Sequence, residues 1–477
     1  MTEVSLPAAF RVQMSDMLGE HEGEAFFRSY TAARTYGLRL NQLKITPVSQ
    51  AVERIQGLFD LRPVPWCSEG FYYNEHVRPG KHPYHSAGLY YIQEPSAMSA
   101  VELLAPEPGE VVLDLAAAPG GKTTQIAAKM AGSGLLISNE IHPQRAKILA
   151  ENVERLGIRN AVVTQATPGE LSARFPLTFD RIMLDAPCSG EGMFRKDPAA
   201  VAEWSPASVE ICVSRQWDIL QDAVAMLKPG GVMAYSTCTF NRHENEEMMA
   251  RLIDEYSFLT LVKEHRIWPH KQQGEGHYVA LVKREVTDSS QYINTYDPNP
   301  PSENRKSRQK GSSGRMEQRS SREAKDISSS WRIFQSWAQA ELPGFKTPDA
   351  APVLFGEALY LLPQSTGYSL SMDQVAGLKI PRAGLHLGEL RKDRFHPAHA
   401  LAMASSAEEA SFVWNLEADS PDVAAYLHGD TLAVPDSLRG WCLVTLSCGE
   451  ERFPLGWGKA SGGQLKNHLP KGLRNLG

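Results

Sequence analysis

The chain has 477 residues, a length that predicts several domains rather than one core. Hydrophobic residues make up 42% of it and charged residues 22%, as in globular proteins. No run approaches the roughly 20 apolar residues that cross a bilayer, and residues 1–10 lack the order of a signal peptide, so we expect a cytoplasmic protein. Six scattered cysteines without a C-x-x-C pair exclude a disulfide framework and argue against a structural metal.

The net charge of −6 does not by itself indicate a protein that binds nucleic acid. Binding to phosphates needs a basic patch rather than a basic protein, however, and two stretches are locally basic. Residues 303–326 hold eight Lys or Arg against four acids, and residues 453–477 hold four Lys or Arg and no acid. Contact with RNA and plain solvation both remain open for these stretches.

Four parts follow one another along the chain. Residues 1–95 mix short helical patterns with aromatic and proline-rich loops, which predicts a small α/β appendage. In residues 96–286, apolar runs alternate with amphipathic segments, which predicts a parallel, doubly wound, Rossmann-like sheet with helices on both faces. We expect residues 277–282 to close that sheet.

The remaining two parts differ in composition. Residues 287–330 are rich in Ser, Asn, Pro, Gly, Arg and Lys and poor in large apolar residues. Such a segment buries too little surface to offset its ordering entropy, so we predict a flexible basic linker. Residues 331–477 contain short apolar runs and turns, which predicts a mixed α/β region of two small modules. We expect the chain to act as a monomer.

A loop of small residues joins a predicted strand to a predicted helix. The strand is Val111-Val-Leu-Asp-Leu115, and Ala116-Ala-Ala-Pro-Gly-Gly-Lys-Thr-Thr124 leads from it into the helix. Small residues let a ligand approach the backbone closely, and free N–H groups at a helix start suit an anionic group. Glu140 ends the next strand, where an acid hydrogen-bonds ribose hydroxyls in doubly wound sheets. The pattern predicts a cofactor site.

The same loop partly matches the phosphate-binding loop of NTPases. Gly121-Lys-Thr123 fits the end of that pattern, and Ile182-Met-Leu-Asp185 is similar to a strand that ends in a magnesium-binding acid. The pattern's first glycine is replaced by Ala116, however, and an NTPase has no use for the cysteines at later strand ends. NTPase activity therefore stays the second hypothesis.

Two cysteines follow the ends of two later predicted strands. Cys188 comes after the strand that ends at Asp185, and Cys238 comes after the run 231–235. Because the carboxyl ends of parallel strands meet where open α/β sheets bind ligands, we expect these three residues to converge beside the cofactor loop. A single buried cysteine is more often inert, but two with an acid favour catalysis.

These motifs carry a resemblance that covers nearly the whole chain outside the predicted linker. Asp185-Ala-Pro-Cys-Ser-Gly-Glu-Gly192 and Ser236-Thr-Cys-Thr239 resemble the paired cysteine motifs of the Sun family of RNA cytosine-C5 methyltransferases. The loop at residues 114–124 is similar to that family's cofactor motif, and residues 37–44 and 93–98 look like its upstream signatures. Residues 384–388 and 455–459 resemble the PUA-like, RNA-binding extension of the bacterial branch that acts on small-subunit ribosomal RNA.

The resemblance implies transfer of a methyl group from S-adenosylmethionine to C5 of cytosine. This carbon is a weak nucleophile until a thiolate adds at C6 and makes an enamine. The resemblance implies that Cys238 is that nucleophile and that Cys188 assists product release, with a structural role for Cys188 as the alternative. It further implies that Asp185, best as a neutral or hydrogen-bonded acid, holds the cytosine ring edge, and that Lys122 contacts or polarises the base. A salt bridge to a neighbouring acid is the alternative for Lys122.

The resemblance also implies a set of cofactor contacts. It places the loop at residues 116–122 around the methionine moiety and Glu140 on the ribose, with Arg145 supporting that side. Related enzymes carry an acid near the adenine, where this chain has Thr167. The expected cofactor residues are Ala116, Ala117, Ala118, Pro119, Gly120, Gly121, Lys122, Glu140, Arg145, Thr167 and Asp185.

Three classes of function stay open at this point. The first is an RNA cytosine methyltransferase, with ribosomal RNA or the small ribosomal subunit as partner, or transfer RNA as the alternative. The second is an NTPase. The third is a non-catalytic RNA-binding or assembly factor, which predicts RNA affinity indifferent to S-adenosylmethionine. In the first class, the N-terminal appendage and the basic C-terminal tail are the expected RNA-positioning surfaces.

Overall fold

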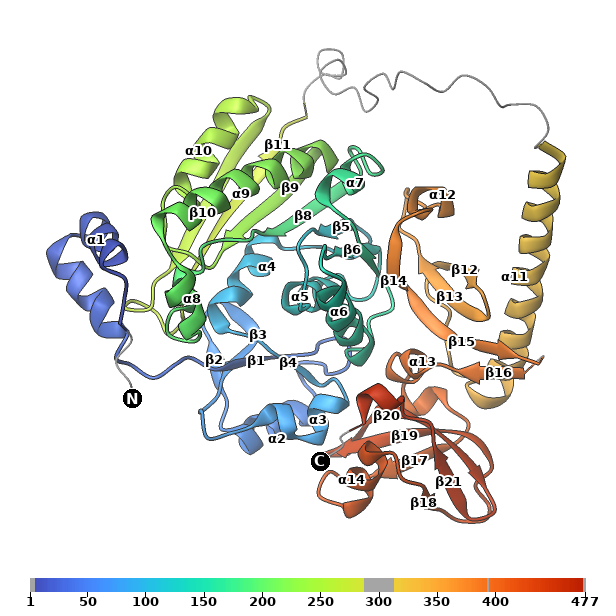
Figure 1. Cartoon of the computed structure of the whole chain (residues 1–477). Coiled ribbons are helices and arrows are strands. Elements are labelled where there is room, and N and C mark those ends of the chain that lie inside the picture. The colour runs from blue at the N-terminus through green and yellow to red at the C-terminus, as the bar shows by residue number, and fades with distance from the viewer. Residues whose placement is uncertain (1–4, 287–312, 393, 475–477) are drawn as a thin grey trace.

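The computed structural model describes residues 5–286, 313–392 and 394–474 (Figure 1). The N-terminal part carries a four-stranded antiparallel sheet in the order β2-β3-β1-β4, as expected of a small α/β appendage. Its helices are α1 (Ala8–Ser29), α2 (Gln50–Phe59) and α3 (Pro83–Ser86), and its strands are β1 (Gly37–Leu40), β2 (Arg62–Val64), β3 (Cys67–Tyr72) and β4 (Tyr90–Ile92).

The central part is a doubly wound sheet, so the predicted fold class is confirmed. The strand order is β10-β11-β9-β8-β5-β6-β7-β14, and the strands from β5 to β9 pair in parallel. The strands are β5 (Val111–Asp114), β6 (Leu135–Asn139), β7 (Ala161–Gln165), β8 (Phe179–Asp185), β9 (Leu227–Thr237), β10 (Leu259–Ile267), β11 (His277–Arg284) and β14 (Lys379–Ala383).

Alternation along the strands gives this sheet two apolar faces. Val111 and Leu113 of β5 join one buried cluster, while Val112 between them joins another. Helices α7 (Pro168–Ser172), α9 (Pro206–Met226) and α10 (Glu246–Glu255) cover the first face, and α4 (Ser99–Leu104), α5 (Gly121–Lys129) and α6 (Pro143–Arg155) cover the second. A short helix, α8 (Pro198–Glu203), precedes α9. Among the helices described, none is long and apolar enough to span a bilayer.

One sequence expectation about the sheet is wrong. Residues 277–282 do not close it, because β11 lies between β9 and the edge strand β10. The reason is that β10 is an exposed, antiparallel strand whose polar sequence, Leu259-Thr-Leu-Val-Lys-Glu-His-Arg-Ile267, shows no buried run. The opposite edge is also not local in sequence, since β14 comes from beyond the predicted linker.

The C-terminal part builds two further sheets, to the right of the central sheet in Figure 1. The first has the order β12-β13-β15-β16 and the second has the order β17-β19-β20-β21-β18. Their elements are β12 (Ala350–Phe355), β13 (Ala358–Pro363), α12 (Met372–Val375), β15 (Leu385–Arg391), β16 (Arg394–Pro397), α13 (His399–Met403), β17 (Val413–Leu416), α14 (Pro421–His428), β18 (Leu432–Ala433), β19 (Gly440–Cys448), β20 (Glu451–Ser461) and β21 (Gln464–Asn467).

The structure describes only the last part of the predicted linker, from Ser313 onward. Residues 287–312 lie outside the described residues, but the chain is helical from Ser313 onward, in α11 (Ser313–Glu341). The C-terminal half of this helix packs through Trp331, Phe334 and Trp337, which share one face because they are spaced three residues apart. The expected boundary at residue 330 therefore falls inside a helix, because the polar composition ahead of Trp331 conceals the helical pattern.

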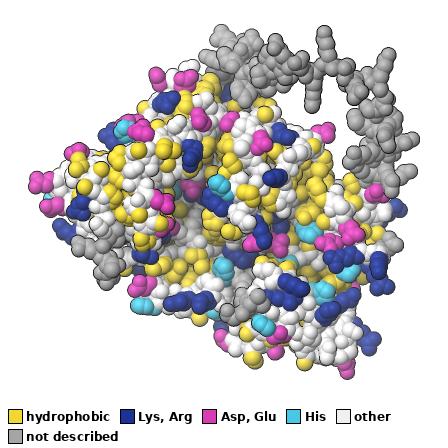
Figure 2. Space-filling model, in the orientation of Figure 1, with side chains coloured by type: hydrophobic (Ala, Val, Ile, Leu, Met, Phe, Trp, Pro, Cys, Tyr) yellow, Lys and Arg dark blue, Asp and Glu magenta, His cyan; other side chains and the backbone are white. Residues whose placement is uncertain are grey.

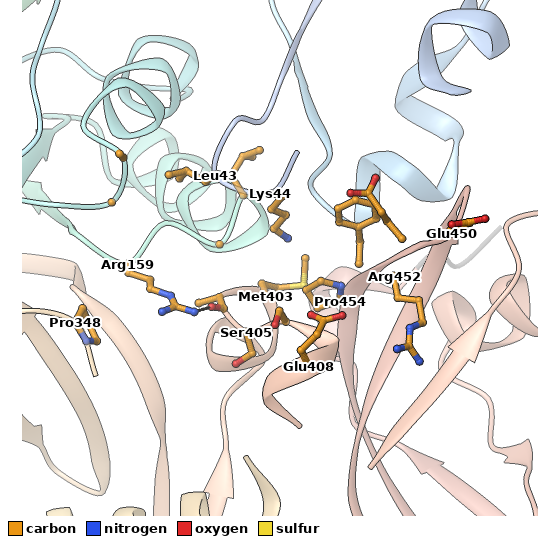
Figure 3. A pocket seen from close by; sticks show the side chains of 18 residues that line it. Leu43, Lys44, Arg159, Pro348, Met403, Ser405, Glu408, Glu450, Arg452 and Pro454 are labelled. Atoms are coloured by element: carbon orange, nitrogen blue, oxygen red, sulfur yellow. Dashed lines mark hydrogen bonds between the residues drawn. The ribbon is translucent and has the colours of Figure 1, made fainter. Parts of the chain in front are cut away.

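A cavity of about 690 Å³ lies where the three parts meet. Lys44 and Leu43 reach it from the N-terminal part, Arg159 from the central part, and Met403 and Arg452 from the C-terminal part (Figure 3). Neither of the cysteines at the strand ends lines it. The cavity therefore marks a junction of domains rather than the predicted chemical site.

An ion-pair network ties the C-terminal part to the central part. Glu154 of α6 lies 3.3 Å from Arg382 Nη1 on β14, and its second oxygen lies 2.8 Å from His399 Nδ1 on α13. Arg382 is buried, with only 4% of its surface exposed. Burial opposes ionisation of Glu154, but the His399 hydrogen bond and the Arg382 charge outweigh it and hold the pKa of Glu154 below its ordinary value.

We expect Glu154→Gln to lower the free energy of unfolding by about 1.5–3 kcal/mol, because it removes a charged hydrogen-bond acceptor from a buried cation. The carboxylate stabilises the fold above its ordinary pKa, and this stabilisation is lost as the pH falls through the lower folded pKa. The difference from the parent protein therefore shrinks below about pH 4. Urea unfolding followed by circular dichroism measures it. Glu151→Gln, exposed on the same helix, is the control, and equal stability of the two variants would contradict the prediction.

Candidate active site

The ends of two neighbouring strands place the two cysteines in contact. β8 and β9 pair in parallel with Asp185 opposite Ser236, so the loops that follow them leave the sheet side by side. Cys188 and Cys238 lie in these loops, and their Sγ atoms are 3.3 Å apart. Both side chains are partly exposed. The structure thus brings Asp185, Cys188 and Cys238 together at the strand ends, as the sequence led us to expect.

Two buried carboxylates hold the cysteine loops in place. Glu244 accepts hydrogen bonds from the backbone N–H of Ser189, 2.9 Å away, and from the Ser189 hydroxyl. Gln216 of α9 donates to the same carboxylate at 2.9 Å. Glu191 accepts from the Phe240 backbone N–H at 3.0 Å and from the Trp204 indole N–H at 3.1 Å. The loop of Cys188 is therefore fastened to the segment that carries Cys238.

Asp185 forms an ion pair with Lys122 beside the thiols. Lys122 Nζ lies 2.8 Å from one carboxylate oxygen, and the Ser236 hydroxyl donates to the other at 2.8 Å. Burial favours the neutral acid, but the Lys122 charge and the hydrogen bonds from Lys122 and Ser236 hold the pKa of Asp185 below its ordinary value. Of the two expected forms, a neutral or a hydrogen-bonded acid, the contacts of Asp185 agree with the hydrogen-bonded one.

Cys188 keeps its proton in this setting. Its hydrogen bond with Cys238 and its burial both raise the pKa of the Cys188 thiol well above its ordinary value. A protonated Cys188 can donate its S–H to the Cys238 sulfur. The contact thus makes Cys188 a possible hydrogen-bond donor to Cys238.

His277 belongs to the site, although no motif revealed it. It begins β11, the antiparallel neighbour of β9, and only 4% of its surface is exposed. Burial and the Lys122 charge, opposed by Asp185, lower the pKa of His277 to about 3, so its ring is neutral. Its Nε2 has no partner among the described residues. The only sequence signal was its position directly before the apolar run 278–282.

The predicted cofactor loop runs from Ala116 to Gly121, at the point where the strand order reverses between β8 and β6. Several neighbours hold its backbone. The Ala117 N–H donates to the Asn139 carbonyl at 2.8 Å, and Arg145 Nη2 donates to the Ala118 carbonyl at 2.7 Å. Asn152 donates to the Pro119 carbonyl at 2.9 Å. Gly120 has φ 114°, a conformation that only glycine adopts easily, and it opens α5 as the N-cap.

Glu140 follows β6 at the same edge of the sheet. Its carboxylate accepts from the His142 backbone N–H at 2.9 Å, and its other oxygen lies 3.3 Å from Arg145 Nη1. Arg145 therefore links the carboxylate to the Ala118 carbonyl, a contact that fits both a supporting position beside the cofactor and a surface ion pair. Each carboxylate oxygen keeps a lone pair free for a ligand hydroxyl.

Thr167 lies at the next strand end but its hydroxyl is already engaged. It is the N-cap of α7 and forms a capping box with Glu170, whose carboxylate lies 3.0 Å from the Thr167 hydroxyl. Thr167 is exposed at the edge of the sheet. Its contact with the adenine stays a prediction, and helix capping is the function that its hydrogen bonds show.

The geometry of the loop disfavours nucleoside triphosphate hydrolysis. In a phosphate-binding loop, the Lys and the following Thr contact phosphates and magnesium. Here Lys122 is paired with Asp185, and the Thr123 hydroxyl donates to the buried Asp114 at 2.6 Å. Burial raises the pKa of Asp114 to about 7, opposed by that hydrogen bond.

One group of possible metal ligands occurs among the described residues. Donor atoms of Cys67, Glu69 and Glu102 lie within 4.8 Å of one another. Lys129 Nζ lies 2.8 Å from Glu102 and 3.7 Å from Glu69, so an ammonium already neutralises the two acids. We interpret this group as an ion pair between β3, α4 and α5.

Oxidation tests the thiol geometry. A disulfide bond needs about 2.05 Å between its sulfur atoms, so a small rotation of either side chain from 3.3 Å closes it. We expect diamide to link Cys188 to Cys238, with one hydrogen lost from each thiol, before it modifies the buried cysteines. Peptide mapping by mass spectrometry detects the linked peptides, which dithiothreitol separates. Cys188→Ser is the control that cannot form the bond, and preferential oxidation elsewhere would contradict the contact.

Family models match most of the chain. Residues 101–283 match a model described as 16S rRNA methyltransferase RsmB/F, and residues 6–95 match the N-terminal domain of 16S rRNA methyltransferase RsmF. Residues 336–404 match the RsmF rRNA methyltransferase first C-terminal domain, and residues 414–475 match the methyltransferase RsmF PUA domain.

Curated relatives and solved structures point the same way. Ribosomal RNA small subunit methyltransferase F of Shewanella amazonensis is 31% identical over 461 residues, covering 91% of each chain. The protein of that name from Serratia proteamaculans is 32% identical over 466 residues, covering 91% of this chain and 89% of that one. A methyltransferase homolog from Pyrococcus horikoshii is 25% identical with TM-score 0.50, covering 58% of this chain and all of that one. NSun6 from the same organism, solved with SFG, shares the fold at 21% identity and TM-score 0.54, covering 60% of this chain and 100% of its own.

Proposed function

Because this chain belongs to the ribosomal RNA small subunit methyltransferase F family, we propose that it methylates C5 of a cytosine in small-subunit ribosomal RNA, with Cys238 as covalent nucleophile. The observation that carries the chemical part of this proposal is the pair of thiols 3.3 Å apart at adjacent strand ends, beside an ion-paired Lys122 and Asp185. We further propose that one copy of the chain suffices, since the described residues supply every group that the reaction needs.

S-adenosylmethionine is the methyl donor, and the residues present fit it. Its sulfonium supplies an electrophilic methyl group when bound. The loop at residues 116–121 offers backbone N–H groups and close approach for the amino-acid end, and Glu140 has lone pairs free for ribose hydroxyls. The loop and the thiols lie on adjacent strand ends, as methyl transfer requires. The individual cofactor contacts, that of Thr167 included, belong to the proposal.

The first step forms a bond between Cys238 Sγ and C6 of cytosine. Cys238 adds as its thiolate, with its proton released to solvent. The C5–C6 π pair shifts to the C4–C5 bond and the C4–N3 π pair shifts onto N3, so C5 becomes nucleophilic enough to take the methyl group. Negative charge develops at N3 and O2, where the Lys122 ammonium can stabilise it. As an ionised carboxylate, Asp185 accepts from the exocyclic amino group and keeps Lys122 in position. In this mechanism Lys122, rather than a neutral Asp185, stabilises the negative charge that develops on the cytosine.

The last step breaks the bond between Cys238 and C6. The C5 proton leaves, the C5–C6 double bond reforms, and the electron pair of the C–S bond returns to Cys238. Cys188 can give its proton to that sulfur, and the thiolate that remains on Cys188 can accept the C5 proton. The raised pKa of Cys188 makes its thiolate, once formed, a strong base for the C5 proton.

RNA must present an unstacked cytosine to this site. A base in a duplex is flipped out before chemistry can reach it, and single-stranded loops offer it directly. We propose that residues 1–95 and 331–477 position the RNA through phosphate contacts, and the match of residues 414–475 to a PUA domain supports the second of these. The proposed target, C5 of a cytosine in ribosomal RNA, therefore depends both on the chemistry of the thiols and on the positioning of the RNA by residues 1–95 and 331–477.

Substitution of the nucleophile tests the covalent step. We expect Cys238→Ser to reduce methyl transfer to background, because a serine hydroxyl is a far weaker nucleophile at neutral pH. The substrate is 16S ribosomal RNA, naked or in small subunits, from cells that lack the gene, and the readout is 5-methylcytosine by mass spectrometry. Cys212→Ser, outside the thiol pair, is the control. Full activity of the Cys238→Ser variant would contradict the proposed covalent mechanism.

Substitution of the second thiol tests product release. We expect Cys188→Ser to accumulate a protein–RNA adduct that survives denaturing gels, because the methylated adduct can no longer be resolved. The adduct should need S-adenosylmethionine and should be absent from the double variant Cys188→Ser/Cys238→Ser. Normal turnover without adduct would assign Cys188 a structural role.

Loss of modification tests the substrate. Deletion of the gene should remove 5-methylcytosine from 16S ribosomal RNA and leave transfer RNA unchanged. A lost site in transfer RNA instead would favour the alternative substrate. Nucleotide hydrolysis that survives Cys238→Ser would favour an NTPase, and RNA binding without any methyl transfer would favour an assembly factor.

A further inference from the structure

Arg39 carries a buried positive charge where the N-terminal sheet meets α5. It lies on β1, and only 1% of its surface is exposed. On the face of the molecule that Figure 2 shows, Lys and Arg side chains are mixed with Asp and Glu side chains at the surface, where water surrounds them. Arg39 has no such hydration, and a buried charge is costly unless nearby groups compensate it. Its contacts therefore bear on its role.

Neutral oxygen atoms accept the hydrogen bonds of Arg39. Its Nε donates to Gln93 Oε1 at 3.1 Å, and its Nη2 donates to Thr124 Oγ1 at 2.7 Å and to the Gly121 carbonyl at 3.3 Å. Gly121 and Thr124 belong to the first turn of α5, directly after the loop that we propose for the amino-acid end of the methyl donor. The guanidinium thus joins the N-terminal part of the chain to the start of the cofactor site.

The charge of Arg39 is only partly compensated. Arg39 forms no ion pair with any residue that the structure describes. Glu69 and Glu102 attract it from a greater distance, but Lys129 Nζ already lies 2.8 Å from Glu102 and 3.7 Å from Glu69. Burial lowers the pKa of Arg39, although a guanidinium keeps its proton in proteins. A further anion near the first turn of α5 would therefore stabilise this cation.

Arg39 also decides which way the side-chain amide of Gln93 points. A guanidinium donates hydrogen bonds and never accepts them, so the amide oxygen faces Arg39 and the amide nitrogen faces away. A Cβ atom placed on Gly121 would lie 3.4 Å from Gln93 Nε2, so this nitrogen is directed at the start of α5. Gln93 is 7% exposed, and its Nε2 makes no hydrogen bond with a described residue. This nitrogen is not among the fully enclosed atoms without a partner, so it keeps accessible surface.

The start of α5 offers further hydrogen-bond donors beside this amide. The first N–H groups of a helix have no partner within it. Gly120, the N-cap of α5, has no side chain that could accept from them. The Gln93 amide, these backbone N–H groups and the charge of Arg39 all favour a negative group at the same place. A carboxylate, with two oxygen atoms that accept, fits this set of donors.

We propose that Arg39 selects the carboxylate of the methyl donor. It holds the Gln93 amide with its N–H groups directed at the carboxylate, and its positive charge stabilises that anion. Arg39 is thus a positioning residue that acts through Gln93. The N-terminal part, which we propose for RNA, in this way also completes the donor site. The inference rests on the proposed function only in that the loop at residues 116–121 holds the amino-acid end of S-adenosylmethionine.

A purely mechanical role is the alternative for Arg39. Its hydrogen bonds could pin α5 to the N-terminal sheet and so keep the loop in shape for any donor. The amide of Gln93 favours selection, because a pin needs only the amide oxygen and gives the direction of the nitrogen no consequence. The two roles differ in one measurable quantity, the preference for a donor that has a carboxylate.

Binding of two donors to the full chain measures this preference. S-adenosylmethionine and decarboxylated S-adenosylmethionine share the adenosine, the sulfonium and the amino group, and they differ in the carboxylate. Isothermal titration calorimetry without RNA gives Kd for each. We expect the parent protein to bind S-adenosylmethionine about tenfold or more tightly, which is the order that hydrogen bonds to a charged group contribute.

Two variants remove the selection in different ways. Arg39→Gln removes the buried charge, whereas Gln93→Glu keeps an acceptor for Arg39 but offers no N–H group and adds a negative charge. Both should weaken the binding of S-adenosylmethionine by about tenfold and leave the decarboxylated donor bound as tightly as before, or more tightly. Arg62→Gln and Gln42→Glu, exposed in the same part of the chain, are the matched controls.

Turnover and folding are measured on the same variants. With RNA present, KM for S-adenosylmethionine should rise in both while kcat changes far less, because binding is lost equally from the ground state and the transition state. Thermal unfolding midpoints establish that the variants are folded. If Arg39→Gln is unfolded, Gln93→Glu carries the test, because it gives the buried guanidinium an ion-pair partner.

Two outcomes would overturn the inference. One is equal affinity of the parent protein for the two donors, and the other is an equal loss of affinity for both donors in the folded variants, which would assign Arg39 the mechanical role. Donor binding needs neither thiol, so Cys238→Ser should keep the preference of the parent protein. Full activity of Cys238→Ser would remove the covalent mechanism and leave selection by Arg39 intact, whereas a parent protein without preference would remove the selection and leave the covalent mechanism untouched.

Discussion

The parallel pairing of β8 with β9 is the interaction on which the chemistry of this protein depends. Because Asp185 lies opposite Ser236, the two loops leave the sheet at the same height, and their thiols meet at 3.3 Å. Side chains alternate between the faces of a sheet, so a slip of one residue would send one partner to the opposite face. The buried Glu191 and Glu244 then hold in place the two loops that this pairing brings together.

The parts of the fold that leave local marks in the sequence could be predicted. Apolar runs that end in small or acidic residues revealed β5, β6, β8 and β9, and the positions of Cys188 and Cys238 after two such runs were enough to predict their convergence. The loop before α5 was readable because small residues cluster there. In each case, the carboxyl end of a strand at one edge of a parallel sheet positions the residues concerned.

The rest depends on contacts between segments far apart in the chain. Nothing in Lys379-Ile-Pro-Arg-Ala383 marks β14 as a strand of the central sheet, because its pairing with β7 is decided in space. The lowered pKa of Asp185 depends on Lys122, a residue of α5, and the place of His277 depends on β11 lying beside β9. No pattern in the sequence marks Glu191 and Glu244 as buried acceptors, because only the folded loops bury them.

The attachment of β14 to β7 has a consequence for how the molecule measures its substrate. This strand makes the C-terminal sheets an extension of the same hydrogen-bonded framework that carries the thiols, and the Glu154 network fastens the junction a second time. A chain cut after residue 286 would leave the β7 edge bare and prone to pair with other molecules. More importantly, the C-terminal sheets are held at a fixed distance from the two thiols, so RNA bound at both places, as proposed, would have to span that distance.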